Sequence, residues 1–225
     1  MKDSIFHSRQ GVTLLGAGDL HAASVAEALT LAPCLVAADG GADRALALGL
    51  SPEAVIGDLD SISAAAREAI GAERIWQIEE QETTDFDKCL RHIEAPFFLA
   101  VGFGGGRLDH TLAAMTVLAR HPGRHLIWLG AEDVAFLAPR ELVLDLAAGT
   151  RVSLFPMGQV RGHATGLRWG LDGDDFAPAG RIGTSNEALG PVRLSLDGPM
   201  LVLLPQEYLR AALAGLGVPP TVLGG

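Results

Sequence analysis

The first half of the chain alternates short runs of apolar residues with longer stretches of helical composition. The apolar runs predict buried strands at residues 12–15, 34–38, 55–56, 74–78, 97–101 and 125–129. The stretches between them predict helices at residues 20–31, 42–48, 64–70, 84–93 and 109–120. Strands that lack polar alternation and are each followed by a helix are typical of a mostly parallel sheet covered on both faces. We therefore predict an N-terminal α/β domain over residues 1–131, with a mostly parallel sheet flanked by helices.

The pattern changes after residue 131, where the apolar segments become short and are separated by glycine or proline. They predict strands at residues 141–145, 151–155, 192–196 and 200–204, followed by a terminal helix at 206–216. The loop at residues 172–180 is acidic and is expected to be irregular. Short strands separated by turn residues indicate a C-terminal antiparallel β-sandwich domain over residues 132–225.

Composition narrows the functional classes. The 225 residues are 48% hydrophobic, which is enough for a sizeable core, and the formal net charge is −10. That charge disfavours nucleic acid and anionic membrane surfaces, since both need a basic footprint. Cys34 and Cys89 have no metal or redox spacing and are expected to be core thiols in a reducing compartment. Because no signal-length or membrane-length apolar run is present, we expect a soluble cytoplasmic protein.

Two carboxylates, Asp58 and Asp60, follow the predicted strand at residues 55–56. Residues two apart in an extended chain project to the same side, and like charges held close repel unless a cation joins them. Oxygen ligands, with no His or Cys nearby in sequence, suit Mg²⁺, which shares its positions between carboxylates and phosphates. The loop therefore predicts a magnesium site. The alternative is an Asp-rich turn that caps a helix beginning near Ser61 or Ser63.

Other predicted strands also end close to acidic residues. Asp39 follows the second strand, and Asp109 follows the glycine cluster after the strand at 97–101. Ligands of open parallel sheets bind beyond the carboxyl ends of the strands. We therefore expect Asp39, Asp109 and the acidic loop to converge at that edge of the sheet.

The glycine-rich stretch at residues 102–106, followed by Arg107, precedes a predicted helix. Its backbone N–H groups, the helix N-terminus and the guanidinium are suited to phosphate oxygens. The alternative is a flexible strand-to-helix turn. Gly16 and Gly18 also form a turn after a strand, but the third glycine of a dinucleotide-binding fingerprint is missing.

The helix predicted at residues 84–93 carries several charged side chains. Asp85 and Lys88 share a face, whereas Asp85 and Asp87 diverge by roughly 200°. We therefore expect Asp85 to point inward beside Lys88, and Asp87 to face solvent or support its neighbours. Lys88 is the only lysine besides Lys2, and neither follows the glycines of a Walker A loop.

In the predicted β domain, Trp169 follows a glycine turn, and residues 183–187 offer a compact set of hydroxyl and amide groups. The indole could stack on a flat ring. The alternative is a tryptophan buried in the β core.

Taken together, these motifs resemble the thiamine pyrophosphokinase family, also called thiamine diphosphokinase, over nearly the whole chain. The matching segments are 39–43 (DGGAD), 57–61 (GDLDS), Gln81 with 84–88 (TDFDK), 105–110 (GGRLDH), 165–169 (TGLRW) and 184–186 (TSN). Each is short, yet their order and spacing are specific. The chain departs from many relatives at Asp43, where they have Asn. The resemblance implies an α/β nucleotide-binding domain followed by a β-sandwich, assembled as a homodimer.

The resemblance further implies Mg²⁺-dependent transfer of a pyrophosphoryl group from ATP to the hydroxyl of thiamine, giving thiamine diphosphate and AMP. The acidic residues would be the catalytic set, Asp39, Asp58, Asp60, Asp85 and Asp109, with Asp58, Asp60 and Asp85 holding the metal. Nucleotide and phosphates would be bound by Gly16, Gly40, Gly41, Lys88, Gly104, Gly105 and Arg107. Thiamine would be bound by Gln81, Trp169, Ser185 and Asn186, the last two acting across the dimer.

Two other readings stay open at this stage. A pyrophosphokinase that acts on a hydroxymethylpterin would keep the reaction and change the acceptor. A sensor that binds thiamine or nucleotide without turnover would keep the fold, although it would not need so many mutually repelling carboxylates.

Overall fold

The computed structural model describes residues 4–223. Residues 1–3 and 224–225, and with them Lys2 and the outer ends of both predicted domains, lie outside the described residues. The chain forms two compact units. The first runs to Val117 and includes residues from Thr221 onward, and the second covers Leu118–Pro220.

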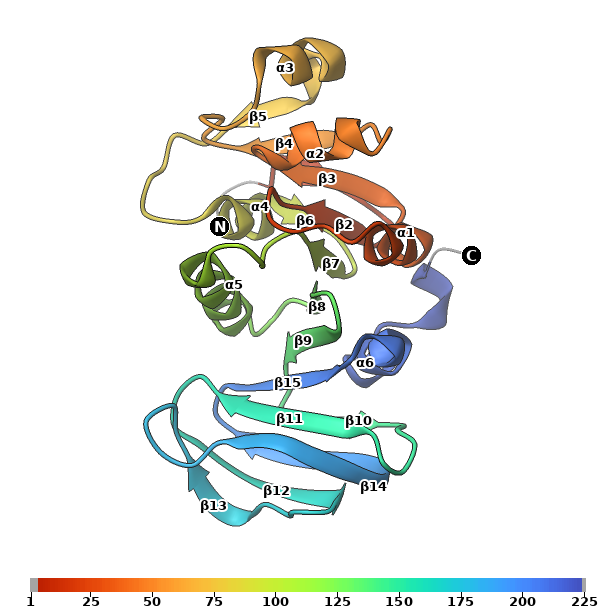
Figure 1. The fold of residues 1–225 in the computed structure, drawn as a ribbon, viewed down its shortest axis with the longest axis vertical. Helices are drawn as coiled ribbons and strands as arrows, with labels where there is room; N and C mark the ends of the chain where they lie inside the picture. Colours follow the sequence, from red (N-terminus) through yellow and green to blue (C-terminus); the bar gives the residue numbers. More distant parts are fainter. Residues whose placement is uncertain (1–3, 224–225) are drawn as a thin grey trace. The chain divides into compact units, whose positions relative to one another are not determined.

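A parallel sheet forms the centre of the first unit, with the strand order β7, β2, β3, β4, β5 (Figure 1). Its strands are β2 (Val12–Leu15), β3 (Cys34–Ala38), β4 (Ala54–Gly57), β5 (Ile75–Gln77) and β7 (Phe98–Val101). Leu14 of β2 pairs with Val36 on one side and with Ala100 on the other. Every residue of β2, β3, β4 and β7 is buried, which explains their mostly apolar sequences. The one hydroxyl among them, that of Thr13, donates to the Ala32 carbonyl.

Helices connect these strands and cover the sheet. They are α1 (Ala22–Leu31), α2 (Gly41–Ala47), α3 (Ala64–Ile70), α4 (Asp85–His92) and α5 (Leu108–Arg120). Figure 1 shows α1 and α2 on one side of the strands and α4 and α5 on the other. Ser63 caps α3 by accepting from the Ala66 N–H, and Thr84 caps α4 by accepting from the Asp87 N–H. The short strands β1 (Phe6–His7) and β6 (Ile93–Glu94) pair in parallel beside them.

The strand order reverses beside β2, because the chain runs from β2 outward to β5 and then returns to β7 on the other side of β2. At such a point the loops that follow two neighbouring parallel strands diverge and leave a crevice. The segments that follow β2 and β7 are the glycine-containing stretches 16–19 and 102–107. The topology thus places both stretches where open α/β sheets bind their ligands.

Antiparallel strands form the second unit, in the order β8, β9, β15, β11, β14, β12, β13, with β10 also paired to β14. They are β8 (Leu126–Leu129), β9 (Asp133–Leu137), β10 (Glu141–Leu144), β11 (Arg151–Pro156), β12 (Val160–Leu167), β13 (Asp172–Phe176), β14 (Gly183–Asp197) and β15 (Met200–Pro205). Leu142 and Leu144 of β10 are buried while their neighbours are exposed, so one face of this strand is in the core. The helix α6 (Leu209–Gly215) packs against β10.

The predicted fold class, parallel strands with helices followed by antiparallel strands, is confirmed, and the strand at 12–15 and the helix at 64–70 match residue for residue. The expectation of an irregular loop at 172–180 is wrong in its first half. There β13 pairs with β12, and Phe176 is buried opposite Val160. The acidic residues and Gly173, whose φ is +80°, concealed this edge strand in the sequence.

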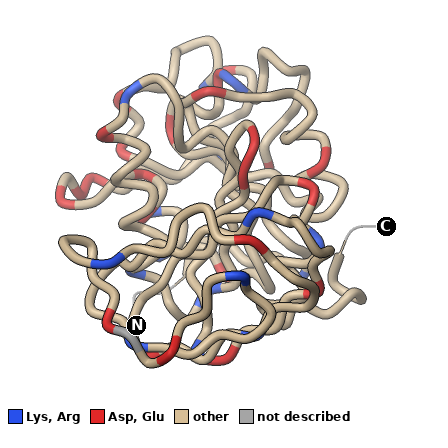
Figure 2. Tube along the Cα trace, turned by 60° about the horizontal axis from the view of Figure 1, so that its bottom comes forward, with Lys and Arg blue, Asp and Glu red and all other residues tan. Residues whose placement is uncertain are grey.

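Within residues 4–223, no helix has the length and apolar character needed to cross a bilayer. Lys and Arg are scattered along the trace in Figure 2 and are outnumbered by Asp and Glu, which gives the net charge of −10.

Candidate active site

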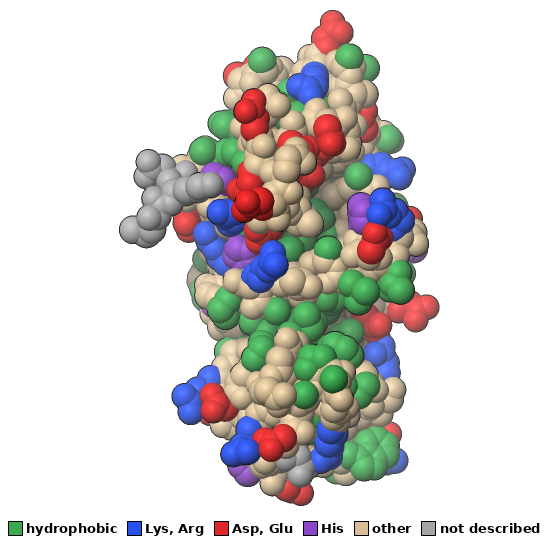
Figure 3. Space-filling view, turned by 90° about the vertical axis from the view of Figure 1, so that its left-hand side faces the viewer, with side chains coloured by type: hydrophobic (Ala, Val, Ile, Leu, Met, Phe, Trp, Pro, Cys, Tyr) green, Lys and Arg blue, Asp and Glu red, His purple; other side chains and the backbone are tan. Residues whose placement is uncertain are grey.

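The acidic loop after β4 brings carboxylates from two strand ends together. Leu59 has a φ of +66°, so the chain turns sharply between Asp58 and Asp60. Asp39, at the end of β3, joins them, and one carboxylate oxygen of each of the three lies within 4.8 Å of the others. Figure 3, which views the molecule from the left of Figure 1, shows Asp and Glu side chains gathered on this face of the upper part. The predicted convergence of Asp39 with the acidic loop is therefore found.

Asp39 is the buried member of this group, with 3% of its surface exposed. Its two carboxylate oxygens accept hydrogen bonds from the backbone N–H groups of Ser61 and Ile62, each at 3.1 Å. Burial raises the pKa of Asp39, the Ser61 N–H opposes this, and the nearby charge of Asp85 raises the pKa further. The acidic loop is thus held against a carboxylate whose ionised form would be stabilised by a nearby positive charge.

Lys88 supplies a positive charge next to this group. Its side chain is 1% exposed, and its Nζ lies 2.8 Å from Asp58 Oδ2 and 2.9 Å from Asp85 Oδ1. The hydrogen bond from Lys88 lowers the pKa of Asp58 below its usual value. The Lys88 ammonium is buried against these carboxylates and does not line the cavity described below. Its contact with phosphates stays a prediction.

Asp85 lines the cavity described below, and its predicted role as a metal ligand stays a prediction. The three carboxylates that lie within 4.8 Å of one another are those of Asp39, Asp58 and Asp60, and Asp85 is not among them. Its Oδ1 instead accepts from Lys88 and from the Asp58 backbone N–H at 3.3 Å. Asp85 therefore fixes the start of the acidic loop.

The expectation that Asp87 faces solvent is wrong. Asp87 is 5% exposed, and its Oδ2 lies 3.9 Å from the Arg91 guanidinium. The helical-wheel argument assumed that α4 buries one face, but the consecutive residues from Phe86 to Leu90 are all buried. Asp87 belongs to an enclosed stretch of helix.

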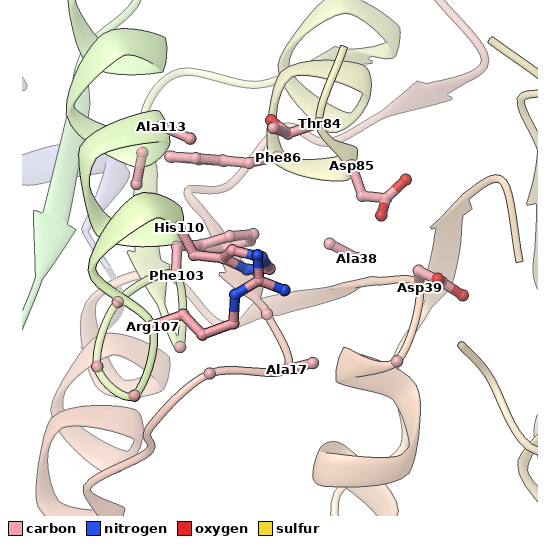
Figure 4. Close-up of a pocket in the computed structure, with 18 of the residues that line it drawn as sticks. Ala17, Ala38, Asp39, Thr84, Asp85, Phe86, Phe103, Arg107, His110 and Ala113 are labelled. Atoms are coloured by element: carbon pink, nitrogen blue, oxygen red, sulfur yellow. The ribbon is translucent and has the colours of Figure 1, made fainter. Parts of the chain in front are cut away.

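A cavity of about 520 Å³ opens beside the acidic group, within the size range of small-molecule sites. It is lined by Gly16, Ala17, Gly18, Asp19, Ala38, Asp39, Gly40, Ser61, Thr84, Asp85, Phe86, Gly102, Phe103, Gly104, Gly105, Gly106, Arg107, His110, Ala113 and Ala114. In Figure 4, Asp39 and Asp85 lie at one end and Phe86 and Ala113 at the other. Arg107 lies between these ends, so the cavity combines an acidic end, a cation and an aromatic end.

Glycine allows the two loops of the cavity to touch. The Gly18 N–H donates to the Gly102 carbonyl at 2.7 Å, and a Cβ on Gly16 would lie 2.4 Å from that same oxygen. Gly16, Gly40, Gly104 and Gly105 line the cavity as predicted. Gly41 does not, because it begins α2 and packs on β2, where an added Cβ would lie 2.1 Å from the Leu15 carbonyl.

Arg107 lines the cavity, whereas Asp109 lies beside Arg107 and not in the group formed by Asp39, Asp58 and Asp60, so its catalytic role stays a prediction. Asp109 binds the guanidinium, with distances of 3.1 Å to Nε and 2.5 Å to a terminal nitrogen. This pairing lowers the pKa of Asp109 and raises that of Arg107. Both side chains are mostly exposed, and of the two only Arg107 lines the cavity. Asp109 therefore orients the cation instead of extending the acidic group.

Several supporting residues were not predicted from the sequence. Asp43 accepts hydrogen bonds from the Ser63 N–H and hydroxyl, which ties α2 to the N-terminus of α3. Asp19 lines the cavity and accepts from the Gly106 N–H at 3.1 Å. The position of Asp19 just beyond a strand end was the available signal for it. The partner of Asp43 depends on tertiary packing that no local pattern reveals.

The aromatic end of the cavity was not predicted either. Phe86 and Phe103 stack with ring centroids 4.1 Å apart and planes 20° apart. They come from α4 and from the loop after β7, which are far apart in sequence. Their contact carries no local sequence signal.

The predicted thiamine-binding residues fall in both units. Gln81 is in the first unit, where its Nε2 donates to Asp58 Oδ2 at 3.2 Å. In the second unit Trp169 is 57% exposed, so its alternative placement in the β core is excluded. Ser185 is exposed with a φ of +60°, and Asn186 is buried with its amide bonded to the Trp169 backbone.

Two family models match the chain. The model described as "Thiamin pyrophosphokinase, catalytic domain" matches residues 25–127, and "Thiamin pyrophosphokinase, vitamin B1 binding domain" matches residues 141–201. The first match contains the acidic loop and the loop with Arg107, and the second contains Trp169 and Asn186.

Similar proteins point the same way. Thiamine pyrophosphokinase 1 of Oryza sativa subsp. japonica is 30% identical over 67% of this chain and 70% of that protein. Thiamine pyrophosphokinase 1 of Arabidopsis thaliana is 30% identical over 66% of this chain and 68% of its own length.

Solved structures support the fold. Thiamin pyrophosphokinase from Candida albicans has a TM-score of 0.74 at 14% identity, covering 89% of this chain and 92% of that one. Yeast thiamin pyrophosphokinase has a TM-score of 0.72 at 18% identity, covering 92% and 93%. At these identities the likeness concerns the fold alone.

Proposed function

This chain belongs to the thiamin pyrophosphokinase family and is a thiamine pyrophosphokinase, and we propose that it carries out pyrophosphoryl transfer in the cavity beside Asp39, Asp58 and Asp60. The observation that carries this assignment is the meeting of three carboxylates, two glycine-containing loops and Arg107 at the point where the strand order reverses. Such a crevice is where open α/β sheets bind nucleotides.

The donor set fits a hard divalent cation. Oxygens of the three carboxylates lie within 4.8 Å of one another, and carboxylates shared with substrate phosphates are the usual environment of Mg²⁺. Burial and the charge of Asp85 raise the pKa of Asp39. A divalent cation beside Asp39 would offset both effects, which supports this assignment. Bound by Asp39, Asp58 and Asp60, Mg²⁺ would neutralise charge on the transferred phosphoryl group.

The remaining residues of the cavity bind and orient the nucleotide. Arg107 offers a planar guanidinium to phosphate oxygens, and Asp109 holds that guanidinium through two hydrogen bonds. Backbone groups of Gly16, Gly40 and Gly104 allow close approach of the nucleotide, since these residues carry no side chain. Lys88 lowers the pKa of Asp58 and holds Asp58 and Asp85 in place, and this gives it a supporting role in transfer.

We assign thiamine to the groups of the second unit together with Gln81. Trp169 presents an exposed indole suited to stacking on a heteroaromatic ring. We also propose the domain assignment of residues 1–131 to nucleotide and catalysis and of 132–225 to thiamine and dimerisation, with Ser185 and Asn186 contributing across a homodimer. A reducing, cytoplasmic compartment is proposed from the two buried free thiols, Cys34 and Cys89.

A competition assay tests this function. The protein is incubated with Mg-ATP and an equimolar mixture of thiamine and a hydroxymethylpterin, and products are identified by mass spectrometry. We expect thiamine diphosphate and an equal amount of AMP, with the pterin unchanged. Pyrophosphorylated pterin would contradict the acceptor assignment. Tight ATP binding without AMP release would favour a sensor that lacks turnover.

A further inference from the structure

Asn186 holds the backbone of Trp169 on both sides. Asn186 is the only asparagine among the 225 residues, and it is 6% exposed. Its Oδ1 accepts from the Trp169 N–H at 3.1 Å, and its Nδ2 donates to the Trp169 carbonyl at 2.6 Å. The same Oδ1 accepts from the Glu187 N–H at 2.8 Å. One buried amide therefore satisfies both backbone polar groups of Trp169 and anchors itself to β14.

A second set of contacts fixes the residue before Trp169. The Arg168 N–H donates to the Glu187 carbonyl at 2.8 Å, and the Arg168 guanidinium lies 2.8 Å from Glu187 Oε1. The same guanidinium lies 5.9 Å from the centre of the Trp169 ring. The segment after β12 is thus tied to β14 at consecutive positions, although Trp169 itself remains 57% exposed.

An exposed indole on a fixed backbone is suited to binding a flat ring. Such a group loses little conformational freedom when a ligand arrives, because its backbone was ordered during folding. Asn186, by contrast, is buried and has both of its amide heteroatoms engaged. It therefore offers little to a substrate directly.

We propose that Asn186 is a positioning residue, which affects thiamine binding only through Trp169. This inference rests on the proposed function, in which the Trp169 indole stacks on a ring of thiamine. It replaces the expected direct contact between the Asn186 amide and thiamine with an indirect role.

A double-mutant cycle tests this role. The KM for thiamine is measured for the wild type, Trp169→Ala, Asn186→Ala and the double variant, at saturating ATP. We expect each single variant to raise this KM about 10-fold, in the range of one stacking contact of about 1–1.5 kcal/mol. Because both act through the same indole, the double variant is expected to match Trp169→Ala alone.

Two outcomes would overturn the inference in distinguishable ways. A double variant whose KM rises by the product of the two single effects would show that Asn186 contacts thiamine independently of Trp169. An unchanged KM in Trp169→Ala would instead refute the stacking assignment of the proposed function, and the inference with it.

Controls separate positioning from loss of fold. Ser195→Ala removes another side-chain hydrogen bond of β14, 2.6 Å to Glu141, and is expected to leave the KM for thiamine unchanged. The KM for ATP should stay constant in all variants. Asn186→Asp keeps both accepted hydrogen bonds but places an oxygen against the Trp169 carbonyl, so an intermediate KM is expected. If Asn186→Ala does not fold, Asn186→Asp serves in the same cycle.

Discussion

The Lys88 ammonium lies 2.8 Å from Asp58 Oδ2 and is almost completely buried. It also bonds Asp85, so a single cation bridges two carboxylates from different elements. Burial alone would lower the pKa of Lys88, but its hydrogen bonds to Asp58 and Asp85 outweigh burial and raise the pKa above 10.5. The acidic site is therefore built around an internal cation that is present before any metal binds.

Replacing Lys88 with Met should destabilise the fold. The change leaves Asp58 and Asp85 without their countercharge, and breaking a buried pair in this way costs about 3 kcal/mol at neutral pH. Urea denaturation measures the free energy of unfolding. Arg161→Met is the control, because Arg161 pairs with Asp175 on the surface and should lose less than about 1 kcal/mol. Equal losses in both variants would contradict the central role of Lys88.

The stability difference between wild type and Lys88→Met should depend on pH. The hydrogen bond from Lys88 lowers the folded pKa of Asp58 below 3.8. Its contribution is therefore complete above pH 3.8 and is lost as the pH falls through the folded pKa. We expect the difference to be constant between about pH 5 and pH 8, because Asp58 is ionised there in both the folded and the unfolded state and Lys88 is protonated in both, and to shrink as the pH falls below 3.8. A difference that persists unchanged at the acid limit would argue against the ion pair.

Asp60 and Asp39 should respond differently to the same change. Asp60 is exposed, and its Oδ1 accepts from the Ser61 hydroxyl, a bond that an amide oxygen can keep. Asp60→Asn should therefore abolish most turnover without changing the melting temperature. Asp39→Asn should lose both turnover and stability, about 1–3 kcal/mol, since its amide nitrogen would face a backbone N–H donor. Near-normal turnover in Asp60→Asn would refute its place in the metal site.

Gly41 should be required for packing and not for nucleotide binding. An added Cβ would lie 2.1 Å from the Leu15 carbonyl, and overpacking of this kind costs about 1–3 kcal/mol. Gly123→Ala is the control, because its Cβ would meet nothing within 4 Å. Thermal unfolding should separate the two variants by several degrees. A stable Gly41→Ala protein with a raised KM for ATP would support the phosphate role instead.

Arg107→Ala should weaken nucleotide binding and leave the fold intact. The guanidinium is exposed and pairs with the neighbouring Asp109. Loss of charge-assisted hydrogen bonds to phosphate corresponds to about 1.5–3 kcal/mol, or at least a 10-fold rise in the KM for ATP. Arg120→Ala, at the other end of α5, serves as the matched control. If both variants keep the wild-type KM, Arg107 does not contact phosphate.

Much of the fold could be predicted because the governing signals are local. The mostly apolar run at residues 12–15 and the Ser63 cap before residues 64–70 specify a buried strand and a helix without reference to the rest of the chain. The spacing of Asp58 and Asp60 likewise places both carboxylates near one another in a turn. The strand β13 escaped prediction because its acidic, glycine-containing sequence gains its structure only by pairing with β12.

The site was less predictable, because its roles depend on partners distant in sequence. Lys88 has the chemistry of a phosphate ligand, but Asp58, thirty residues away, holds it in the interior. Asp109 lies beyond a strand end, as Asp39 does, but its carboxylate pairs with the neighbouring Arg107 and is mostly exposed. The Trp169 backbone is bonded by the side chain of Asn186, seventeen residues further along. No local periodicity contains this information.

The most direct test of the account measures both products against the divalent cation. AMP and thiamine diphosphate are quantified for the wild type with ATP and thiamine, first in EDTA and then over a Mg²⁺ titration, with Asp60→Asn alongside. We predict no product in EDTA, equal amounts of both products once Mg²⁺ is added, and a higher Mg²⁺ requirement for any residual activity of Asp60→Asn. Undiminished formation of both products in EDTA would contradict the proposal that Asp39, Asp58 and Asp60 act through a bound metal ion.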